Sequence, residues 1–462
     1  MAVFYDVAVA GGGPAGAFAA HELTRAGLRV CLIDPGTGRS RLEGLAERVV
    51  QLLGVKGLEA ALATATAKPV PRSVAWAGLA GTENGERLVL RPAFDAALRR
   101  AAVAAGAHLC TARVSRILEK DPEKGALLKL STGEEIAARL LVDARGRQAP
   151  SARRLMGPRT LAISGKVETS AGLAGTHVAA SPQGWLWVAE LPGYGRFLQV
   201  AIDAGDLAGE RSRAGQAVLK ARMIRFLRQV SFRDRFGITS FDGPLSARSA
   251  GLVLSVPELN LPVIPIGDAA VAIDPLSGHG IFWALSSALA AVPAILTILE
   301  DRANGPDLAA RFYRSRVVDT FWRQARTGRD FYRLEEYLAE LPFWAARASW
   351  PDDAPSHHAA ASVRIERRVV VEGNRLKERE VLVTPRDPSG VAFVAGIPVK
   401  DLTGFIADNA GTQALPADPS PALLTAVQWL ESRGLRDGLQ CQTLPRTYPK
   451  NRTTPIRTRE TA

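Results

Sequence analysis

The hydrophobic residues near the N-terminus are arranged as a strand, a helix and a second strand. Residues 3–10 form a mainly apolar run, residues 11–16 are rich in glycine, and an alanine-rich segment continues to Arg25. A second apolar run, residues 29–33, ends at Asp34. Short apolar runs on either side of a helical segment are typical of buried parallel strands. The pattern therefore predicts a β-α-β unit of a parallel sheet.

Later segments extend this outline. Residues 261–266 form another apolar strand, and Ile281–Leu299 is an apolar helix that opens from a glycine-rich turn and contains two serines and a proline. The polar residues and the turn favour a helix buried in a large core, so no membrane span is expected. Residues 306–345 have a helical pattern, residues 363–395 alternate as in a hairpin or small sheet, and residues 420–434 form a short amphipathic helix.

The composition is that of an ordinary globular protein. The chain has 462 residues, of which 47% are hydrophobic and 23% charged, which predicts two or three packed units. Its cysteines, Cys31, Cys110 and Cys441, are too far apart for a Cys-x-x-Cys motif, and its six histidines include no His-Glu-x-x-His motif. A disulfide framework and a metal site are therefore not expected, whereas a cytoplasmic location is.

Positive charge is distributed unevenly along the chain. The net charge is +12, and residues 211–235 contain eight lysines and arginines against the single acid Asp234. Aromatic residues do not alternate with these cations as in a base-stacking platform, so a nucleic-acid partner is not expected. An acidic or protein partner and an ordinary solvated helix face both remain open. Residues 439–462, rich in Pro, Thr and Arg, are predicted to form a disordered basic tail.

The glycine-rich turn has the spacing of a dinucleotide-binding loop. Gly11 allows a tight turn, Gly13 lets backbone N–H groups approach a pyrophosphate, and Gly16 lets the helix and strand pack closely. Asp34 follows Gly13 by about 20 residues, the spacing expected of the acid that binds a ribose hydroxyl. The turn therefore predicts a bound dinucleotide, with FAD and NAD both possible at this point.

Motifs farther along the chain distinguish FAD from NAD. Arg91–Leu98 reads Arg-x-x-Phe-Asp-x-x-Leu, residues 141–147 include Val-Asp-Ala, Gly267-Asp268 follows an apolar strand, and residues 274–280 read Asp-Pro-Leu-Ser-Gly-His-Gly. In this order the motifs resemble those of FAD-dependent aromatic monooxygenases of the para-hydroxybenzoate hydroxylase type. The resemblance implies that Asp268 binds the ribityl or ribose chain and that the loop after Asp274 lies along the isoalloxazine.

The resemblance also implies a set of site residues. His279 is expected to be a catalytic donor beside the flavin, although a turn-capping role is equally compatible with the sequence. The residues expected to bind FAD are Gly11, Gly13, Pro14, Ala15, Gly16, Asp34, Glu43, Gly44, Arg91, Gly267, Asp268, Pro275, Gly278, Gly280 and Ile281.

A Gly-Trp-x-Trp segment at residues 184–187 resembles a motif of flavin-dependent tryptophan halogenases. Trp185 and Trp187 share one face of the predicted strand, where they either wall the catalytic pocket or fill a core. The loop after Asp274 differs from the Phe-rich halogenase loop. Lys56 and Lys68 lie in the region where a halogenase lysine is plausible, but neither belongs to a recognisable motif.

The loop after Asp274, the tryptophan strand and residues 366–398 are together similar to flavoprotein monooxygenases that hydroxylate a protein tryptophan during tryptophylquinone cofactor biogenesis. The resemblance implies hydroxylation of an indole ring through a flavin C4a-hydroperoxide, with O2 as co-substrate. It also implies a protein or peptide substrate that carries the target tryptophan. Electrons would come from NAD(P)H directly or through a flavin reductase. A tryptophan halogenase, a geranylgeranyl-type flavin reductase and a flavin-binding scaffold without turnover are the alternatives.

The same resemblance implies the architecture. An α/β fold is expected, with a Rossmann-type FAD-binding domain of the GR2 type, an inserted antiparallel β-sheet substrate domain and a smaller C-terminal α+β domain. The expected boundaries are 1–72, 98–160 and 262–305 for the flavin domain, 73–97 and 161–261 for the substrate-covering sheet, 306–438 for the C-terminal domain and 439–462 for the tail.

Overall fold

The computed structural model divides the chain into two compact units, each with a hydrophobic core. Unit 1 comprises residues 1–358 and 369–378, and unit 2 comprises residues 359–368 and 379–462. The structure describes residues 3–38, 40–150, 154–170, 172, 175–205, 215–228, 236–255, 258–357, 362–406 and 414–436. The predicted disordered tail, residues 439–462, lies outside the described residues, as do both ends of the basic segment 211–235.

Unit 1 is built on a seven-stranded sheet whose parallel strands carry the predicted β-α-β unit. In spatial order its strands are β6 (His108–Cys110), β2 (Val30–Ile33), β1 (Val3–Ala10), β9 (Glu135–Asp143), β8 (Gly125–Leu130) and β7 (Val114–Asp121), and β17 (Val263–Pro265) pairs with β9. β6, β2, β1, β9 and β17 run parallel. Their carboxyl ends therefore meet at one edge, where Ala10 pairs with both Ile33 and Asp143.

Alternation along β1 gives this sheet two buried faces. Val7 and Val9 point into a large core shared with α1 (Pro14–Arg25), α4 (Arg91–Ala104) and α7 (Gly280–Glu300), whereas Ala8 and Ala10 point to a core on the opposite face. Successive side chains of a strand point to opposite faces, so a strand covered on both sides is apolar throughout. This accounts for the continuous apolar run in the sequence.

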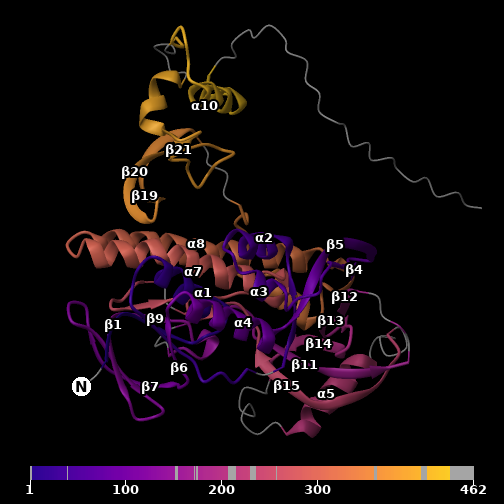
Figure 1. The fold of residues 1–462 in the computed structure, drawn as a ribbon. Helices are drawn as coiled ribbons and strands as arrows, with labels where there is room; N and C mark the ends of the chain where they lie inside the picture. Colours follow the sequence, from indigo (N-terminus) through magenta and orange to yellow (C-terminus); the bar gives the residue numbers. More distant parts are fainter. Residues whose placement is uncertain are drawn as a thin grey trace, which may run out of the picture. The chain divides into compact units, whose positions relative to one another are not determined.

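The apolar helix predicted at Ile281–Leu299 is confirmed as the buried helix α7. It is long and apolar enough to cross a membrane, with a mean hydropathy of 2.0, but 67% of its most apolar stretch is buried inside the protein. Figure 1 shows α7 alongside α1 and α8 (Gly305–Arg333), and both helices pack against it. Its apolar surface is therefore used by the core of unit 1.

An eight-stranded sheet forms the other half of unit 1. In spatial order its strands are β15 (Ile238–Ser249), β11 (Thr160–Thr169), β14 (Gly195–Asp203), β13 (Gly184–Leu191), β12 (Thr176–Ser181), β4 (Val70–Trp76), β5 (Leu79–Leu90) and β3 (Leu42–Leu45). All neighbours are antiparallel except β12 and β4, where two distant parts of the sequence meet. The predicted fold class, a Rossmann-type α/β domain with an inserted antiparallel sheet, is confirmed.

Smaller elements complete unit 1. A three-stranded sheet consists of β10 (Leu155–Met156), β16 (Val253–Leu254) and β18 (Val271–Ala272). The remaining helices of the described part are α2 (Glu47–Val55), α3 (Glu59–Leu62), α5 (Gln216–Arg228) and α9 (Pro342–Ala348). α5 packs against β15 through Leu219, Met223 and Phe226, so its cationic residues are left on the outer side.

The described part of unit 2 contains short strands, a 3-10 helix (Val399–Phe405) and the helix α10. β19 (Arg364–Glu372) pairs with β20 (Arg375–Val383), and β21 (Phe393–Val394) pairs with β22 (Ile397–Pro398). α10 (Pro421–Ser432) is capped by Ser420, whose Oγ accepts the N–H of Leu423 at 3.2 Å. The predicted hairpin and amphipathic helix are both present.

The contact-based units do not coincide with the boundaries expected from the sequence. α8 packs against α7 and α9, so residues 306–358 group with unit 1 and only the later part of the expected C-terminal domain 306–438 lies in unit 2. The hairpin β19–β20 runs through both units, because its turn belongs to unit 1. The finer boundaries of the flavin and sheet domains remain a prediction.

Candidate active site

A cavity of about 1250 Å³ is lined by residues from both sheets of unit 1. Most of the predicted site residues line it: Gly11, Gly13, Pro14, Ala15, Asp34, Glu43, Gly44, Arg91, Trp185, Trp187, Asp268, Pro275, Gly278, Gly280 and Ile281. Gly16, Gly267 and His279 are not among its lining residues. The structure thus brings together residues that are far apart in the sequence, and their individual roles remain predictions.

Two glycines of the first turn are required by close packing, and a third faces open space. Gly11 has a φ of +104°, and a Cβ at this position would lie 2.5 Å from the carbonyl oxygen of Ala144. A Cβ at Gly16 would overlap the carbonyl oxygen of Gly11. At Gly13 the nearest atom would be 3.9 Å away, in the Arg91 side chain. The open cradle at the start of α1 therefore fits the pyrophosphate of FAD.

Asp34 is held at the end of β2 by two backbone donors. The N–H of Gly12 donates to Asp34 Oδ2 at 2.6 Å, and the N–H of Gly36 donates to Oδ1 at 2.8 Å. Arg99 lies 3.6 Å from Oδ1 and donates to the carbonyl oxygen of Gly12 at 3.1 Å. Sequence reasoning missed Arg99, although it directly follows the Arg91–Leu98 motif on α4.

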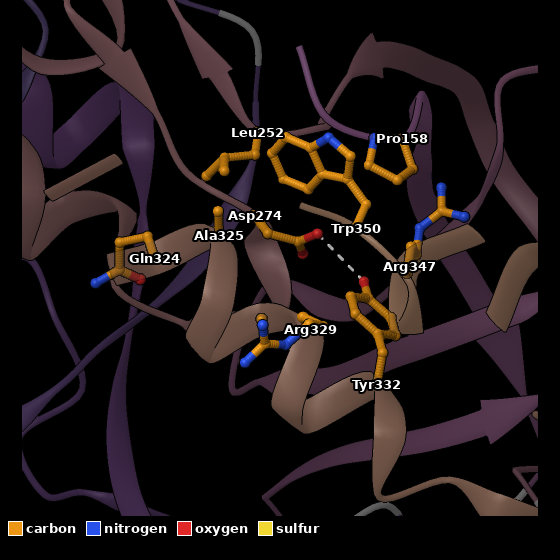
Figure 2. A pocket seen from close by; sticks show the side chains of 10 residues that line it. Pro158, Leu252, Asp274, Gln324, Ala325, Arg329, Tyr332, Arg347 and Trp350 are labelled. Atoms are coloured by element: carbon orange, nitrogen blue, oxygen red, sulfur yellow. Dashed lines mark hydrogen bonds between the residues drawn. The ribbon is translucent and has the colours of Figure 1, made fainter. Parts of the chain in front are cut away.

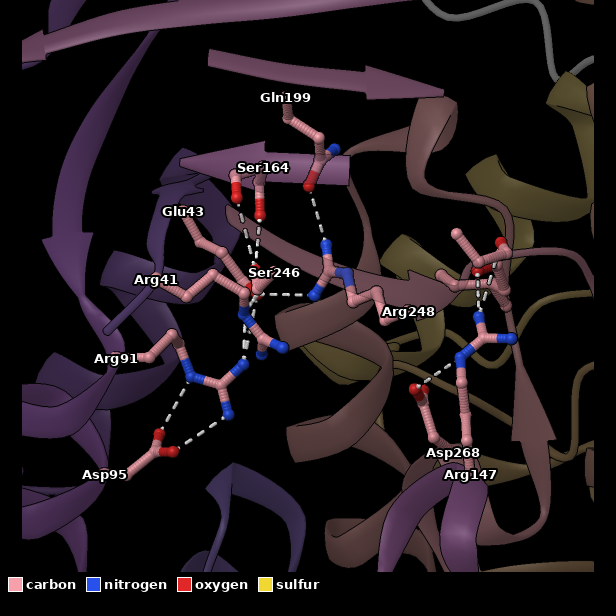
Figure 3. A network of polar contacts seen from close by, with 12 residues as sticks. Arg41, Glu43, Arg91, Asp95, Arg147, Ser164, Gln199, Ser246, Arg248 and Asp268 are labelled. Atoms are coloured by element: carbon pink, nitrogen blue, oxygen red, sulfur yellow. Dashed lines mark hydrogen bonds and ion pairs between the residues drawn. The ribbon is translucent and has the colours of Figure 1, made fainter. Parts of the chain in front are cut away.

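A half-buried ion network lies on one wall of the cavity (Figure 3). Glu43 of β3 is 2.5 Å from Arg41, 3.2 Å from Arg91 and 3.8 Å from Arg248 of β15. Arg91 also donates two hydrogen bonds to Asp95, at 2.9 and 3.0 Å. Burial alone would raise the pKa of Glu43, but the three guanidinium groups outweigh it and lower that pKa to about 2.

The network leaves fixed positive charge beside the cradle. Three arginines surround one glutamate, and Asp95 is the second acid of the group. Burial lowers the pKa of Arg41 to about 10, which still leaves it charged at neutral pH. Arg91 and Glu43 were predicted only through the family resemblance, and nothing in the sequence pointed to Arg41 or Arg248. The charge suits a ligand with phosphate groups.

The loop before α7 lines the part of the cavity where the flavin ring is expected. Asp274 Oδ1 accepts the N–H of Leu276 at 2.9 Å, and Gly278 has a φ of +63°. His279 precedes the first turn of α7. Burial, followed by the positive charges of Arg48 and Arg72, lowers the pKa of His279 to about 4. His279 is therefore neutral at pH 7, and its predicted role as a donor beside the flavin remains untested.

A chain of buried hydrogen bonds connects the tryptophan strand to this loop. Trp185 Nε1 donates to Tyr332 Oη at 3.3 Å, and Tyr332 Oη donates to Asp274 Oδ2 at 3.2 Å. Burial raises the pKa of Tyr332 well above its ordinary value and also raises the pKa of Asp274. Figure 2 shows the Tyr332–Asp274 bond at a neighbouring small cavity of about 20 Å³, enough for one water molecule. Sequence reasoning included neither residue in the site.

Trp185 and Trp187 both face the main cavity from β13, as their two-residue spacing predicts. Trp187 Nε1 donates to Glu86 Oε1 at 3.4 Å, so both indole N–H groups have acceptors. Behind Trp185, the rings of Trp344 and Tyr332 pack edge to face with centroids 5.8 Å apart. The two tryptophans therefore form a supported aromatic wall.

The cradle, the acid after β2 and the loop at the start of α7 together define an FAD-dependent oxidoreductase. The profile of the lycopene cyclase protein family matches residues 6–162. The solved structure of the peptidyl tryptophan dihydroxylase QhpG, essential for tryptophylquinone cofactor biogenesis, is 35% identical, with a TM-score of 0.78, and the match covers 94% of this chain and 100% of that chain. The chain belongs to the family of flavoprotein monooxygenases that includes this dihydroxylase. The resemblance recognised in the sequence is confirmed.

More distant proteins share the fold. The menaquinone reductase of Mycobacterium tuberculosis is 29% identical over 368 residues, which cover 73% of this chain and 85% of that protein. The flavin-dependent halogenase CmlS is 17% identical with a TM-score of 0.68, and the match covers 94% of this chain and 93% of that one. The halogenase match shows the common fold alone. The chain is therefore an enzyme of the FAD-dependent class, and its substrate needs a separate argument.

Replacing Gly13 with valine should prevent FAD binding without unfolding the protein. The φ of −71° at Gly13 suits valine, and the new side chain would occupy the open space in front of α1. Flavin absorbance after reconstitution should show at least ~10-fold weaker FAD binding. Gly54→Val on α2 is the matched control, because a Cβ there meets no atom within 4 Å. Equal flavin content in the two variants would contradict the assignment of the cradle.

Glu43→Gln should destabilise the protein most strongly near neutral pH. The folded-state pKa of about 2 lies below the ordinary value of 4.5, so ionised Glu43 stabilises the fold above about pH 4.5 and this contribution is lost as the pH falls toward 2. We expect a loss of about 1–3 kcal/mol in the free energy of unfolding at pH 7, measured by urea titration. The difference from the unmodified protein should shrink in acid. Glu47→Gln, at an exposed position on α2, should change little.

Proposed function

We propose that this enzyme hydroxylates the indole ring of a tryptophan side chain within a protein or peptide, in the biogenesis of a tryptophylquinone cofactor. The observation that carries the proposal is the match to the peptidyl tryptophan dihydroxylase, which extends over 94% of this chain at 35% identity. A match limited to the flavin core would support only shared cofactor chemistry. A match over 94% of the chain is longer than the flavin core alone.

The size and lining of the cavity support an aromatic substrate beside the cofactor. Its volume of about 1250 Å³ exceeds the ~300–1000 Å³ of ordinary small-molecule pockets, which leaves room for a dinucleotide and a further ring. Trp185, Trp187, Val178 and Leu276 contribute aromatic and apolar surface to the lining. Indole rings pack well against other aromatic rings in edge or offset geometry. A tryptophan side chain is therefore a suitable occupant.

The residues of this chain have positioning and electrostatic roles in the proposal. When bound, FAD supplies the redox chemistry that activates oxygen. The backbone N–H groups of Gly280 and Ile281, at the positive end of the α7 dipole, would stabilise negative charge on a flavin bound in the cavity. Tyr332 positions Trp185 and Asp274 by bonding to both. The closely packed aromatic wall keeps water away from the reacting ring.

The proposal includes O2 as co-substrate and NAD(P)H as the source of electrons, used directly or through a partner flavin reductase. A cytoplasmic location, where NAD(P)H is available, belongs to the same proposal. Oxidation of NADH and NADPH by the purified enzyme, with and without an added flavin reductase, distinguishes the two routes.

The lysine positions favour hydroxylation over halogenation. Lys56 pairs with Glu22 on α1, and Lys68 is exposed. Neither lysine belongs to the cavity lining, and the lining residues in the described part of unit 1 include no other lysine. A halogenase of the family needs a lysine to carry the halogenating species, so this cavity suits transfer of oxygen better.

The proposed reaction can be tested by mass spectrometry. The purified enzyme, with FAD, NADH, a flavin reductase and O2, is incubated with a tryptophan-containing protein encoded next to its gene. Mass gains in steps of about 16 Da on tryptophan are expected. A product that forms only with added chloride or bromide would instead identify a halogenase, and saturation of a menaquinone side chain would identify a reductase. If the protein binds flavin but changes none of these substrates, the remaining alternative is a flavin-binding scaffold without turnover.

A conservative change at Trp185 tests the aromatic wall in the same assay. Trp185→Phe keeps a ring in place but removes the donor to Tyr332, so FAD content should be retained while the hydroxylation rate falls. Trp322→Phe on α8, which packs against Phe321 in a different core cluster, is the matched control. Full activity of Trp185→Phe would show that Trp185 contributes only packing.

The outer face of α5 offers a docking surface for an acidic protein substrate. Lys220, Arg225 and Arg228 are exposed and Arg222 is half-buried, opposite the apolar residues that pack on β15. Clustered charge of this kind raises the rate of association with a partner of opposite charge.

Reversing three charges on α5 (Arg222→Glu, Arg225→Glu and Arg228→Glu) should therefore raise the KM for the protein substrate, more at low salt than at high salt, with FAD content unchanged. The matched control reverses Lys120, Lys124 and Lys129, which are exposed on the β7–β8 hairpin. The same KM in both triple variants would rule out docking on α5.

A further inference from the structure

Two cysteines and a histidine meet at the β6 edge of the parallel sheet, on strands that are distant in the sequence. Cys31 Sγ lies 3.3 Å from Cys110 Sγ, and Cys110 Sγ lies 3.7 Å from His108 Nδ1. One ligand atom from each of the three residues lies within 4.8 Å of the others. The hydroxyl of Tyr5 on β1 is 2.6 Å from His108 Nδ1. Three side chains that can bind a metal therefore lie together, with the hydroxyl of Tyr5 beside His108.

The strand register explains this grouping. Cys31 of β2 pairs with His108 of β6, and Ile33 pairs with Cys110. Residues two apart on a strand point to the same face, so His108 and Cys110 both project beside Cys31. Because the cysteines are separated by 79 positions in the sequence, their linear spacing gave no indication of a shared site. The expectation that the chain has no metal site came from the linear spacing of its cysteines and histidines.

We propose that Cys31, His108 and Cys110 form a site for a thiophilic metal ion of the Zn²⁺ class, with water as the fourth ligand. In a tetrahedral zinc site, with Zn–S about 2.3 Å and Zn–N about 2.0–2.1 Å, neighbouring ligand atoms lie about 3.6–3.8 Å apart. The sulfur–nitrogen distance of 3.7 Å fits this geometry, and the sulfur–sulfur distance of 3.3 Å needs to lengthen by about 0.5 Å. Two thiolates and an imidazole are the donors that zinc prefers.

The site is accessible from outside and tied to the nucleotide end of the FAD site. His108 is exposed and Cys110 is half-buried, so an ion can enter without unfolding the sheet. The carbonyl oxygen of Cys110 accepts the N–H of Asp34 at 3.0 Å. A bound ion would therefore fix the ends of β2 and β6, and with them Asp34. We assign the ion a structural role, away from the reacting ring.

Cobalt titration tests the proposal directly. The full-length protein, reduced and stripped of metal, is titrated anaerobically with Co²⁺, which reports thiolate ligands by a near-ultraviolet charge-transfer band and tetrahedral geometry by its visible bands. One Co²⁺ per chain is expected, displaced by Zn²⁺. His108→Asn and Cys110→Ser should each weaken binding by at least ~10-fold. Cys441→Ser is the control, because the third cysteine is not among the proposed ligands and its loss should leave Co²⁺ binding unchanged.

Flavin content shows whether each variant is folded, so that a loss of metal binding can be told apart from misfolding. Both ligand variants should still bind FAD, because neither side chain lines the cavity. Three results would overturn the proposal: no thiolate charge-transfer band in the reduced protein, equal Co²⁺ affinity in the ligand variants and the unmodified protein, or a band that disappears in Cys441→Ser. The reduced protein could instead take up no metal and form a Cys31–Cys110 disulfide in air. That result would show a thiol pair in place of a metal site.

Discussion

A half-buried carboxylate shared among three guanidinium groups connects both edge strands of the eight-stranded sheet to α4 beside the cavity. Glu43 and Arg41 belong to the edge strand β3 and the segment before it, Arg91 begins α4, and Arg248 comes from β15. Charges removed from water are tolerated only when they are paired and hydrogen-bonded, so these elements must meet in one arrangement. The resulting wall carries positive charge, and the glycine cradle opens beside it. Architecture and cofactor affinity thus depend on the same ion network.

The local parts of this design could be predicted from the sequence, because each is encoded within a few residues. Gly11, Gly13 and Gly16 identify the turn through their spacing, and the two-residue spacing of Trp185 and Trp187 places both on one strand face. Arg248, Tyr332 and the Cys31–Cys110 pair have no such local signal. They reach their partners through strand register and helix packing, which depend on the assembled fold. The sequence therefore indicated the cofactor loop well, but it did not indicate the charge network, the hydrogen-bond chain or the metal-ligand cluster.

The two sheets of unit 1 contribute different kinds of residues to the site. The parallel sheet presents the backbone N–H groups of the glycine turn, Asp34 and the start of α7. The antiparallel sheet presents Trp185 and Trp187, and the lining contains arginines but no lysine among the described residues. Substrate choice in this fold is therefore expected to reside in the second sheet, where side chains can change without disturbing the cradle.

The charge at the start of α7 is insensitive to pH across the physiological range. His279 has a pKa of about 4, so between pH 5 and pH 8 it stays neutral and contributes no titrating charge. The positive potential there comes from backbone N–H groups and the helix dipole, which do not titrate. Tyr332 titrates far above this range, because burial and the nearby Asp274 disfavour its ionised form. A change in flavin reactivity between pH 5 and pH 8 is therefore not expected to originate in His279 or Tyr332, whereas Asp274 of the same loop has a pKa that burial raises toward this range.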